Sequence, residues 1–163
     1  MTWKTIIGEV KRVRKGERVG YDLTERLTRD TVVAVLPIGY WHGYDRGLSS
    51  IGEVLVRGRR AKVLGRVSMD MTAVDVTGNP GVRIGDEVVL IGRQGREFIG
   101  ADEMAGKIST TAYEILTRVN PLIRRTRFKQ KKCGMGPFGL PASWSDVAAC
   151  RRRSPFPHQG DLR

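Results

Sequence analysis

Tyrosine is the residue type with the clearest chemical potential in this sequence. Tyr21, Tyr40, Tyr44 and Tyr113 each lie at the end of a segment, close to glycine, threonine or a charged residue. A phenol in such a place can face a cleft, and it can abstract a proton if its pKa is lowered by its surroundings. Tyrosines are also common as half-buried rim residues of β-structures, with the hydroxyl in water. The residues alone leave both interpretations open.

Other catalytic signatures are absent. The two histidines, His42 and His158, lie in different regions, and the sequence contains no HExxH, no Walker loop and no GxSxG. Cys133 and Cys150 form neither a CxxC pair nor a metal-ligand spacing with a histidine. We therefore expect free thiols and no metal site.

The net charge of +12 suggests nucleic-acid binding at first sight. However, residues 126–163 carry 8 Lys and Arg against 2 Asp and Glu, so this quarter of the chain supplies half of the charge. No run reaches the roughly 18 apolar residues that cross a bilayer, and the first residues lack the order of a signal peptide. The expected location is the cytosol.

The elements that must position these residues are mostly strands. Short runs of β-branched residues recur between turn residues, and they lie at 3–13, 31–38, 52–56, 61–67, 71–76 and 87–91. One short helix is predicted at 100–108, since acidic residues begin it and Met104 and Ile108 share a face. Residues 113–119 are predicted to be a further strand. The chain is therefore predicted to be all-β, a small closed or nearly closed barrel with one short helix.

This pattern stops near residue 125. Beyond it the sequence is dense in Arg, Pro, Gly and Ser, without a sustained period. We predict a β-domain over residues 1–128, followed by an irregular basic tail over 129–163. The tail is expected to be disordered or non-native, as a shifted reading frame would produce.

Several motifs resemble, in order and spacing, the carboxy-terminal β-domain of alanine racemases. They are VGY at 19–21, LPIGY at 36–40, GYDRGLS at 43–49, GRVSMD at 65–70, GDEV at 85–88 and YEILTRVNP at 113–121. The resemblance covers residues 3–125 and nothing after about residue 128.

The resemblance implies a pyridoxal-phosphate enzyme that interconverts L- and D-alanine for cell-wall synthesis. In that family an amino-terminal barrel holds the cofactor through a lysine, and the β-domain of the partner subunit closes the site. By resemblance, Tyr21 is the catalytic base opposite that lysine, and the Met69 N–H binds the substrate carboxylate. The remaining roles implied are a phosphate contact from Tyr113 and a substrate entryway lined by Tyr40, Arg46 and Arg66.

Plainer interpretations of the same residues stay open. Met69 stands between Val67 and Met71 at strand spacing, which core packing alone would explain. Arg46 and Arg66 could be solvated charges at strand ends. Trp41-His42 departs from the family, which commonly has a small residue and then an acid there, so the shape of the entryway is open.

Two hypotheses of function follow. In the first, the chain is the β-domain half of an alanine racemase, either encoded separately or cut from a longer frame. It then cannot racemise alone, because no lysine-bearing barrel precedes Trp3, and its partners are a barrel domain or a homodimer partner and L- or D-alanine. In the second, it is a small basic β-barrel that binds nucleic acid or an acidic partner, with a steep dependence on salt.

Overall fold

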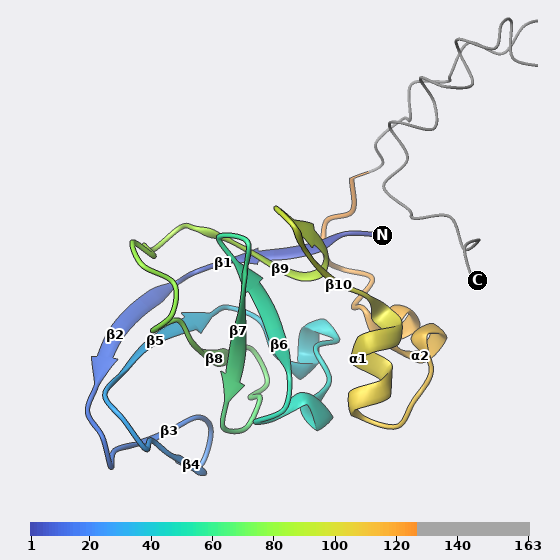
Figure 1. The fold of residues 1–163 in the computed structure, drawn as a ribbon. Helices are drawn as coiled ribbons and strands as arrows, with labels where there is room; N and C mark the ends of the chain where they lie inside the picture. The colour runs from blue at the N-terminus through green and yellow to red at the C-terminus, as the bar shows by residue number, and fades with distance from the viewer. Residues whose placement is uncertain (127–163) are drawn as a thin grey trace, which may run out of the picture. The chain divides into compact units, whose positions relative to one another are not determined.

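An antiparallel sheet carries the fold in the computed structural model, which describes residues 1–126 (Figure 1). Its strands are β1 (Trp3–Ile6), β2 (Glu9–Val13), β5 (Thr31–Leu36), β6 (Glu53–Val56), β7 (Arg59–Leu64), β8 (Thr72–Asp75), β9 (Glu87–Gln94) and β10 (Glu97–Ile99). The order across the sheet is β1, β9, β6, β7, β8, β5, β2, with β10 also paired to β9. Each end strand pairs on one side within the described residues, so the sheet is not closed. This agrees with the predicted nearly closed all-β barrel.

A separate two-stranded hairpin follows β2. It consists of β3 (Arg18–Val19) and β4 (Glu25–Arg26), which pair antiparallel. The loop between them contains Tyr21. This hairpin therefore carries one predicted site residue outside the main sheet.

The strands form because their apolar residues fill one shared core. β5 is a buried run, and its Ala34 and Leu36 are fully buried. From the neighbouring strands, Val63 and Val74 face each other in the β7–β8 pairing and are also fully buried. Burial of such side chains stabilises a fold by about 1.5–3 kcal/mol each.

Two α-helices and two short 3₁₀ helices complete the described part. They are α1 (Ala101–Lys107), α2 (Ala112–Arg118), η1 (Tyr40–His42) and η2 (Arg46–Leu48). Figure 1 shows α1 and α2 side by side, and the two helices pack on each other. The prediction of α1 is confirmed, with Met104 buried and Glu103 in its first turn.

The prediction of a strand at residues 113–119 is wrong, since helix α2 lies there. The Thr111 side chain accepts a hydrogen bond from the Glu114 N–H at 3.4 Å and caps the helix. Glu114 also forms an ion pair with Arg118 one turn later. Ile115 is buried and Val119 follows four residues later, which is helical spacing. The cap and this spacing outweigh the β-branched composition of the run.

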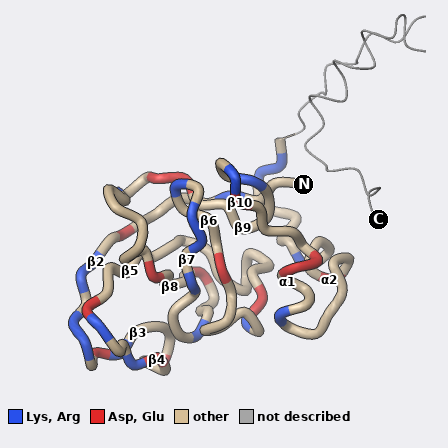
Figure 2. The backbone as a smooth tube through the Cα atoms, viewed as in Figure 1, with Lys and Arg blue, Asp and Glu red and all other residues tan. Residues whose placement is uncertain are grey.

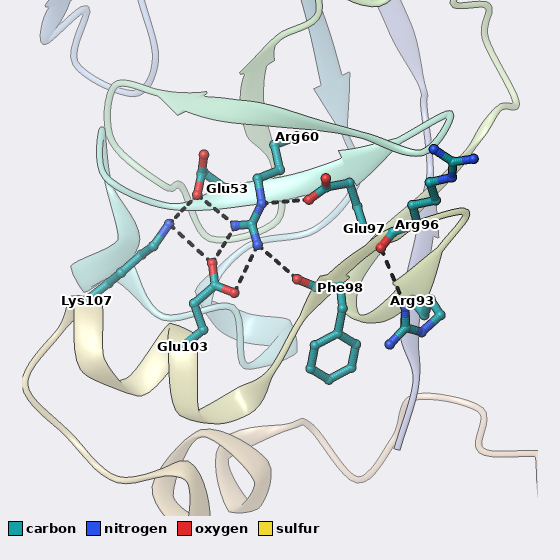
Figure 3. A network of polar contacts seen from close by, with 8 residues as sticks. All are labelled: Glu53, Arg60, Arg93, Arg96, Glu97, Phe98, Glu103 and Lys107. Carbon is teal, nitrogen blue, oxygen red and sulfur yellow. Dashed lines mark hydrogen bonds and ion pairs between the residues drawn. The ribbon is translucent and has the colours of Figure 1, made fainter. Parts of the chain in front are cut away.

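An ionic network fastens α1 to the sheet (Figure 3). The Arg60 guanidinium on β7 donates to Glu53 at 3.0 Å, to Glu97 at 3.0 Å and to Glu103 of α1. Lys107 at the other end of α1 donates to Glu53 at 2.6 Å. Both ends of the helix are thereby held by side chains on β6 and β7.

The predicted tail at 129–163 lies outside the described residues, together with Cys133, Cys150 and His158. Within residues 1–126 no helix combines the length and the apolar character that crossing a bilayer requires.

Candidate active site

The loop that carries Tyr21 lies against the segment that follows β7, and a pair of glycines stands at the contact. A Cβ atom on Gly20 would lie 2.8 Å from the Gly65 Cα, and one on Gly65 would lie 2.9 Å from the Gly20 Cα. Both residues also have positive φ, +83° and +68°, which favours glycine. At this contact the Tyr21 N–H donates to the Arg66 carbonyl at 3.4 Å, and the two residues form an antiparallel bridge. The glycines thus allow Tyr21 and Arg66 to be neighbours.

Arg66 holds the Tyr21 loop by its backbone and by its side chain. The Arg66 N–H donates to the Thr24 hydroxyl at 3.3 Å, and that hydroxyl donates to the Tyr21 carbonyl at 3.4 Å. The guanidinium pairs with Asp22 at 2.9 Å. Asp22 and Leu23 both have left-handed backbones, with φ of 59° and 51°, a costly conformation for leucine. A strained turn therefore sets the position of Tyr21.

Tyr40 and Met69 lie on two segments that are hydrogen-bonded to each other. The Tyr40 N–H donates to the Ser68 carbonyl at 3.0 Å, and the Trp41 N–H donates to the Met69 carbonyl at 2.9 Å. Gly39 permits this approach, because a Cβ there would overlap the Ser68 carbonyl. Met69 is 52% exposed, so the core-packing interpretation is wrong for it. Within residues 1–126 its N–H donates no hydrogen bond, which leaves it available to a ligand.

Arg46 is connected to this segment through Ser49. The Ser49 hydroxyl donates to the Arg46 carbonyl and accepts from the Val67 N–H at 3.1 Å. Asp45 caps η2 by accepting from the Gly47 N–H at 2.7 Å. The Arg46 side chain is exposed and forms no ion pair within the described residues. Its exposure suits a solvated charge as well as an entryway residue.

Tyr113 lies at the start of α2 and is 83% exposed. Its helix is docked at the opposite end, where the Asn120 N–H donates to the His42 carbonyl at 3.1 Å and the Asn120 side chain donates to the Trp41 carbonyl at 3.0 Å. The hydroxyl of Tyr113 makes no hydrogen bond in the described part of the chain. Main-chain contacts thus join the segments of Tyr21 and Arg66 and those of Tyr40 and Met69, and Arg46 is linked to them through Ser49, whereas Tyr113 stands on a separate element.

Tyr44 differs from the other tyrosines. It is fully buried, packs edge-on against Trp3 with ring centroids 6.3 Å apart, and has no hydrogen-bond partner for its hydroxyl among the described residues. Burial, with a smaller contribution from nearby Glu53, raises its pKa. The interpretations of Tyr44 as a rim residue or as a cleft residue are therefore both wrong.

One residue of this region was not predicted from the sequence. The Glu25 carboxylate on β4 accepts from the Gly65 N–H at 2.6 Å and from the Ser50 hydroxyl at 2.6 Å. No motif distinguishes Glu25 along the chain, because its partners lie 25 and 40 residues away. Only the folded chain shows it beside the Tyr21 loop.

A pocket of about 380 Å³ lies away from these residues. Its lining residues come from β2, β5 and the segment after β8, and they include Val10, Lys11, Arg12, Val32, Val76 and Val82. Figure 2 shows Lys and Arg gathered along β2 and the β3–β4 hairpin. None of the six predicted site residues lines this pocket. Within residues 1–126 no group of three or more His, Cys, Asp or Glu side chains is placed to hold a metal ion.

Comparison with known proteins identifies the family. Residues 1–127 match the family model described as alanine racemase, C-terminal domain. This chain belongs to the alanine racemase C-terminal domain family. The resemblance of the motifs is thereby confirmed, and the relatives are isomerases of which this chain corresponds to the C-terminal domain.

The curated relatives are alanine racemases. The enzyme of Halothermothrix orenii is 47% identical over 131 residues, which are 80% of this chain and 34% of that protein. The enzyme of Sorangium cellulosum is 47% identical over 120 residues, which are 71% of this chain and 32% of that protein. The chain therefore spans about a third of the length of these relatives.

Solved structures of alanine racemases share the fold of this chain. The alanine racemase of Bacillus anthracis with bound L-Ala-P matches with a TM-score of 0.68 at 38% identity, over 73% of this chain and 30% of that chain. The biosynthetic alanine racemase of Pseudomonas aeruginosa also gives 0.68 at 38% identity, over 74% and 32%. The fold of the described residues is thus that of the alanine racemase C-terminal β-domain.

Proposed function

We propose that this domain forms one wall of the active site of a pyridoxal-phosphate-dependent alanine racemase. The reaction is the interconversion of L- and D-alanine, which supplies D-alanine for cell-wall precursors in the cytosol. The observation that carries the proposal is the bridge between Tyr21 and Arg66, whose segment continues to Met69 and is hydrogen-bonded there to the segment of Tyr40. Three of the motifs that suggest the family are therefore neighbours in the fold.

Tyr21 is the base of this wall. Its side chain is 56% exposed, so the phenol is open to a substrate that approaches this face. Arg66 is its main-chain neighbour, and the Arg66 guanidinium pairs with Asp22 of the same loop at 2.9 Å. This pair holds the loop that presents the phenol.

The substrate contacts lie next to this base. The Met69 N–H is free within the described residues and can donate to the alanine carboxylate, which needs no polar side chain at that position. Tyr40, which is 47% exposed, and Arg46 line the path by which the amino acid arrives. The basic residues of the path favour an anionic carboxylate over a neutral ligand.

The described residues suit pyridoxal phosphate at one edge only. The exposed and unpartnered hydroxyl of Tyr113 can donate to a phosphate oxygen. When bound, the cofactor supplies the electron sink that makes the Cα proton of alanine acidic enough to remove. Tyr21 takes or returns that proton on one face of Cα. The opposite face requires a second base, the lysine of a barrel domain in the same complex or in a homodimer partner.

Reconstitution tests this function. The 163-residue chain is mixed with the part of the Halothermothrix orenii racemase that it does not cover, and conversion of L-alanine is followed by circular dichroism. We expect no racemisation by either piece alone and measurable racemisation by the mixture with pyridoxal phosphate. Turnover by this chain alone would contradict the proposal. So would an inactive mixture in which the two pieces form a stable complex that binds the cofactor.

A further inference from the structure

Glu25 joins three segments, which are its own hairpin, the segment of Ser50 and the stretch at 62–65. Its carboxylate accepts from the Gly65 N–H at 2.6 Å, from the Ser50 hydroxyl at 2.6 Å and from the Lys62 ammonium at 3.3 Å. Only 21% of the side chain is exposed. A carboxylate this buried is stabilised by such donors, because hydrogen bonds to a charged acceptor are stronger than those between neutral groups.

Each of these segments carries a residue of the proposed site. Glu25 itself is on the hairpin whose loop holds Tyr21, and it pairs with Val19 across that hairpin. Gly65 precedes Arg66, the residue that bridges to Tyr21. The carboxylate therefore ties the two segments that place Tyr21 and Arg66.

Ser50 connects Glu25 and Gly65 to the segment that carries Arg46. The Ser50 N–H donates to the Gly65 carbonyl at 3.0 Å, so serine and glycine are joined both directly and through Glu25. Ser49, the preceding residue, holds the Arg46 carbonyl and the Val67 N–H. The contacts thus run from the Tyr21 hairpin to the helix that carries Arg46.

The ionisation of Glu25 fits this arrangement. Burial alone would raise its pKa, but the hydrogen bonds from Ser50 and Gly65 and the charge of Lys62 together lower it below the usual value of 4.5. The carboxylate is therefore ionised at neutral pH. Protonation would weaken all three contacts, because a neutral carboxyl group is a poorer acceptor.

We propose that Glu25 is a positioning residue for the racemase site: its carboxylate fixes the Tyr21 hairpin against Gly65 and Arg66. The inference rests on the proposed function of Tyr21, and it concerns the placement of that phenol. Glu25 itself touches neither substrate nor cofactor. A merely structural role would instead make Glu25 one more contributor to the stability of the whole domain.

The first test uses the chain alone and does not depend on racemase activity. The Gly65 amide proton is followed by NMR between pH 7 and pH 3, together with the amide exchange of residues 20–24. In the wild type we expect the Gly65 resonance to titrate with a midpoint below 4.5. In Glu25→Gln we expect no such titration, and exchange at 20–24 and 65–67 that is about tenfold faster, with β5 and β9 unchanged.

Glu17→Gln is the matched control. Glu17 is an exposed glutamate beside the same hairpin, so the substitution removes the same charge without touching Gly65. We expect it to leave the Gly65 titration and the exchange rates as in the wild type. A Gly65 amide that is insensitive to Glu25, or faster exchange throughout the sheet in Glu25→Gln, would overturn the proposal.

The second test uses the reconstituted racemase. We expect Glu25→Gln to lower kcat about tenfold with KM changed less than twofold, because a misplaced base slows proton transfer more than it weakens binding. Glu25→Asp, which keeps the charge on a shorter chain, should recover part of the rate. A similar loss of kcat/KM that came from KM alone, with kcat unchanged, would overturn the positioning role. If the wild-type mixture is inactive, the proposed function fails, whereas the NMR test still decides whether Glu25 fixes the hairpin.

Discussion

The network around Arg60 and the Tyr21 surface differ in how their polar groups are paired. The Tyr21 surface consists of the exposed residues Tyr21, Tyr40, Arg46, Arg66 and Met69. Around Arg60, the carboxylates of Glu53, Glu97 and Glu103 all point to one guanidinium, and Lys107 adds a second cation (Figure 3). These side chains satisfy one another, and they fasten a helix to a sheet. The network is complete within the described residues and needs no ligand.

The Tyr21 surface is held together mainly by main-chain hydrogen bonds, and several of its polar side chains have no partner within the described residues. Its segments are joined by main-chain hydrogen bonds and by Glu25, while the hydroxyls of Tyr21 and Tyr40 and the guanidinium of Arg46 have no partner within residues 1–126. The difference in pairing distinguishes the part of the domain that stabilises the fold from the part that is available to a ligand. A rigid scaffold that holds exposed, unsatisfied polar groups suits a surface that is completed by another domain and a ligand.

Removal of Arg60 should have the largest effect on stability. Arg60→Gln leaves three carboxylates close together without their shared cation. We expect the free energy of unfolding to fall by about 2 kcal/mol, which is roughly 8 °C in the thermal midpoint. Arg59→Gln is the control, because within residues 1–126 the side chain of Arg59, on the same strand, donates only to the Gly78 carbonyl, at 2.8 Å. Calorimetry that gives equal midpoints for both variants would remove the distinction between the two regions.

A fall in pH should weaken the Arg60 network before it affects the packing of the apolar core. A hydrogen bond from Lys107, supported by the charges of Lys107 and Arg60, lowers the pKa of Glu53 from its usual 4.5 although burial opposes this. A lowered carboxylate pKa gives stability that is present above pH 4.5 and is lost as the pH falls through the folded-state value. Urea midpoints of the wild type should therefore be flat from neutral pH to about pH 5.5 and fall below it.

Glu53→Gln serves as the comparison for this pH dependence. The variant should be less stable than the wild type at neutral pH, and the two should converge as the acid limit is approached. A difference that is the same at every pH would mean that the charge of Glu53 is not what stabilises the network.

Substitutions of the exposed site residues without a described partner should have the smallest effect on stability. Arg46→Gln and Tyr113→Phe remove groups without a described partner, so we expect changes of less than about 0.5 kcal/mol in urea unfolding. In the reconstituted racemase the same variants should lower kcat/KM. A loss of stability as large as that of Arg60→Gln would show that these residues belong to the scaffold instead.

Local patterns predict the sheet well and α2 poorly. Thr31–Leu36 and Glu87–Gln94 are strands because β-branched runs between turn residues fill a core from either side. The run at 113–119 has a similar composition, but Thr111 and Glu114 form a helix cap that composition alone does not show. Packing against α1 completes the helix.

The site depends on contacts that no local pattern contains. The motifs point to Tyr21 and Arg66 one by one. Their pairing depends on the close approach of Gly20 and Gly65, which are far apart in the sequence. Glu25 carries no motif at all, and its partners become visible only once the hairpin lies on Gly65. The burial of Tyr44 cannot be predicted either, because a tyrosine beside glycine looks the same along the sequence whether it is buried or exposed.

Exchange of the alanine α-hydrogen in D₂O tests the central claim, that Tyr21 is the base of one face of the substrate. The reconstituted racemase with Tyr21→Phe is started separately from L-alanine and from D-alanine, and deuterium at Cα is measured by NMR. Because each base serves one face, exchange from one enantiomer should fall by at least about a hundredfold while the other stays within a few-fold of the wild type. Wild-type exchange from both enantiomers would contradict the account and make Tyr21 a structural tyrosine.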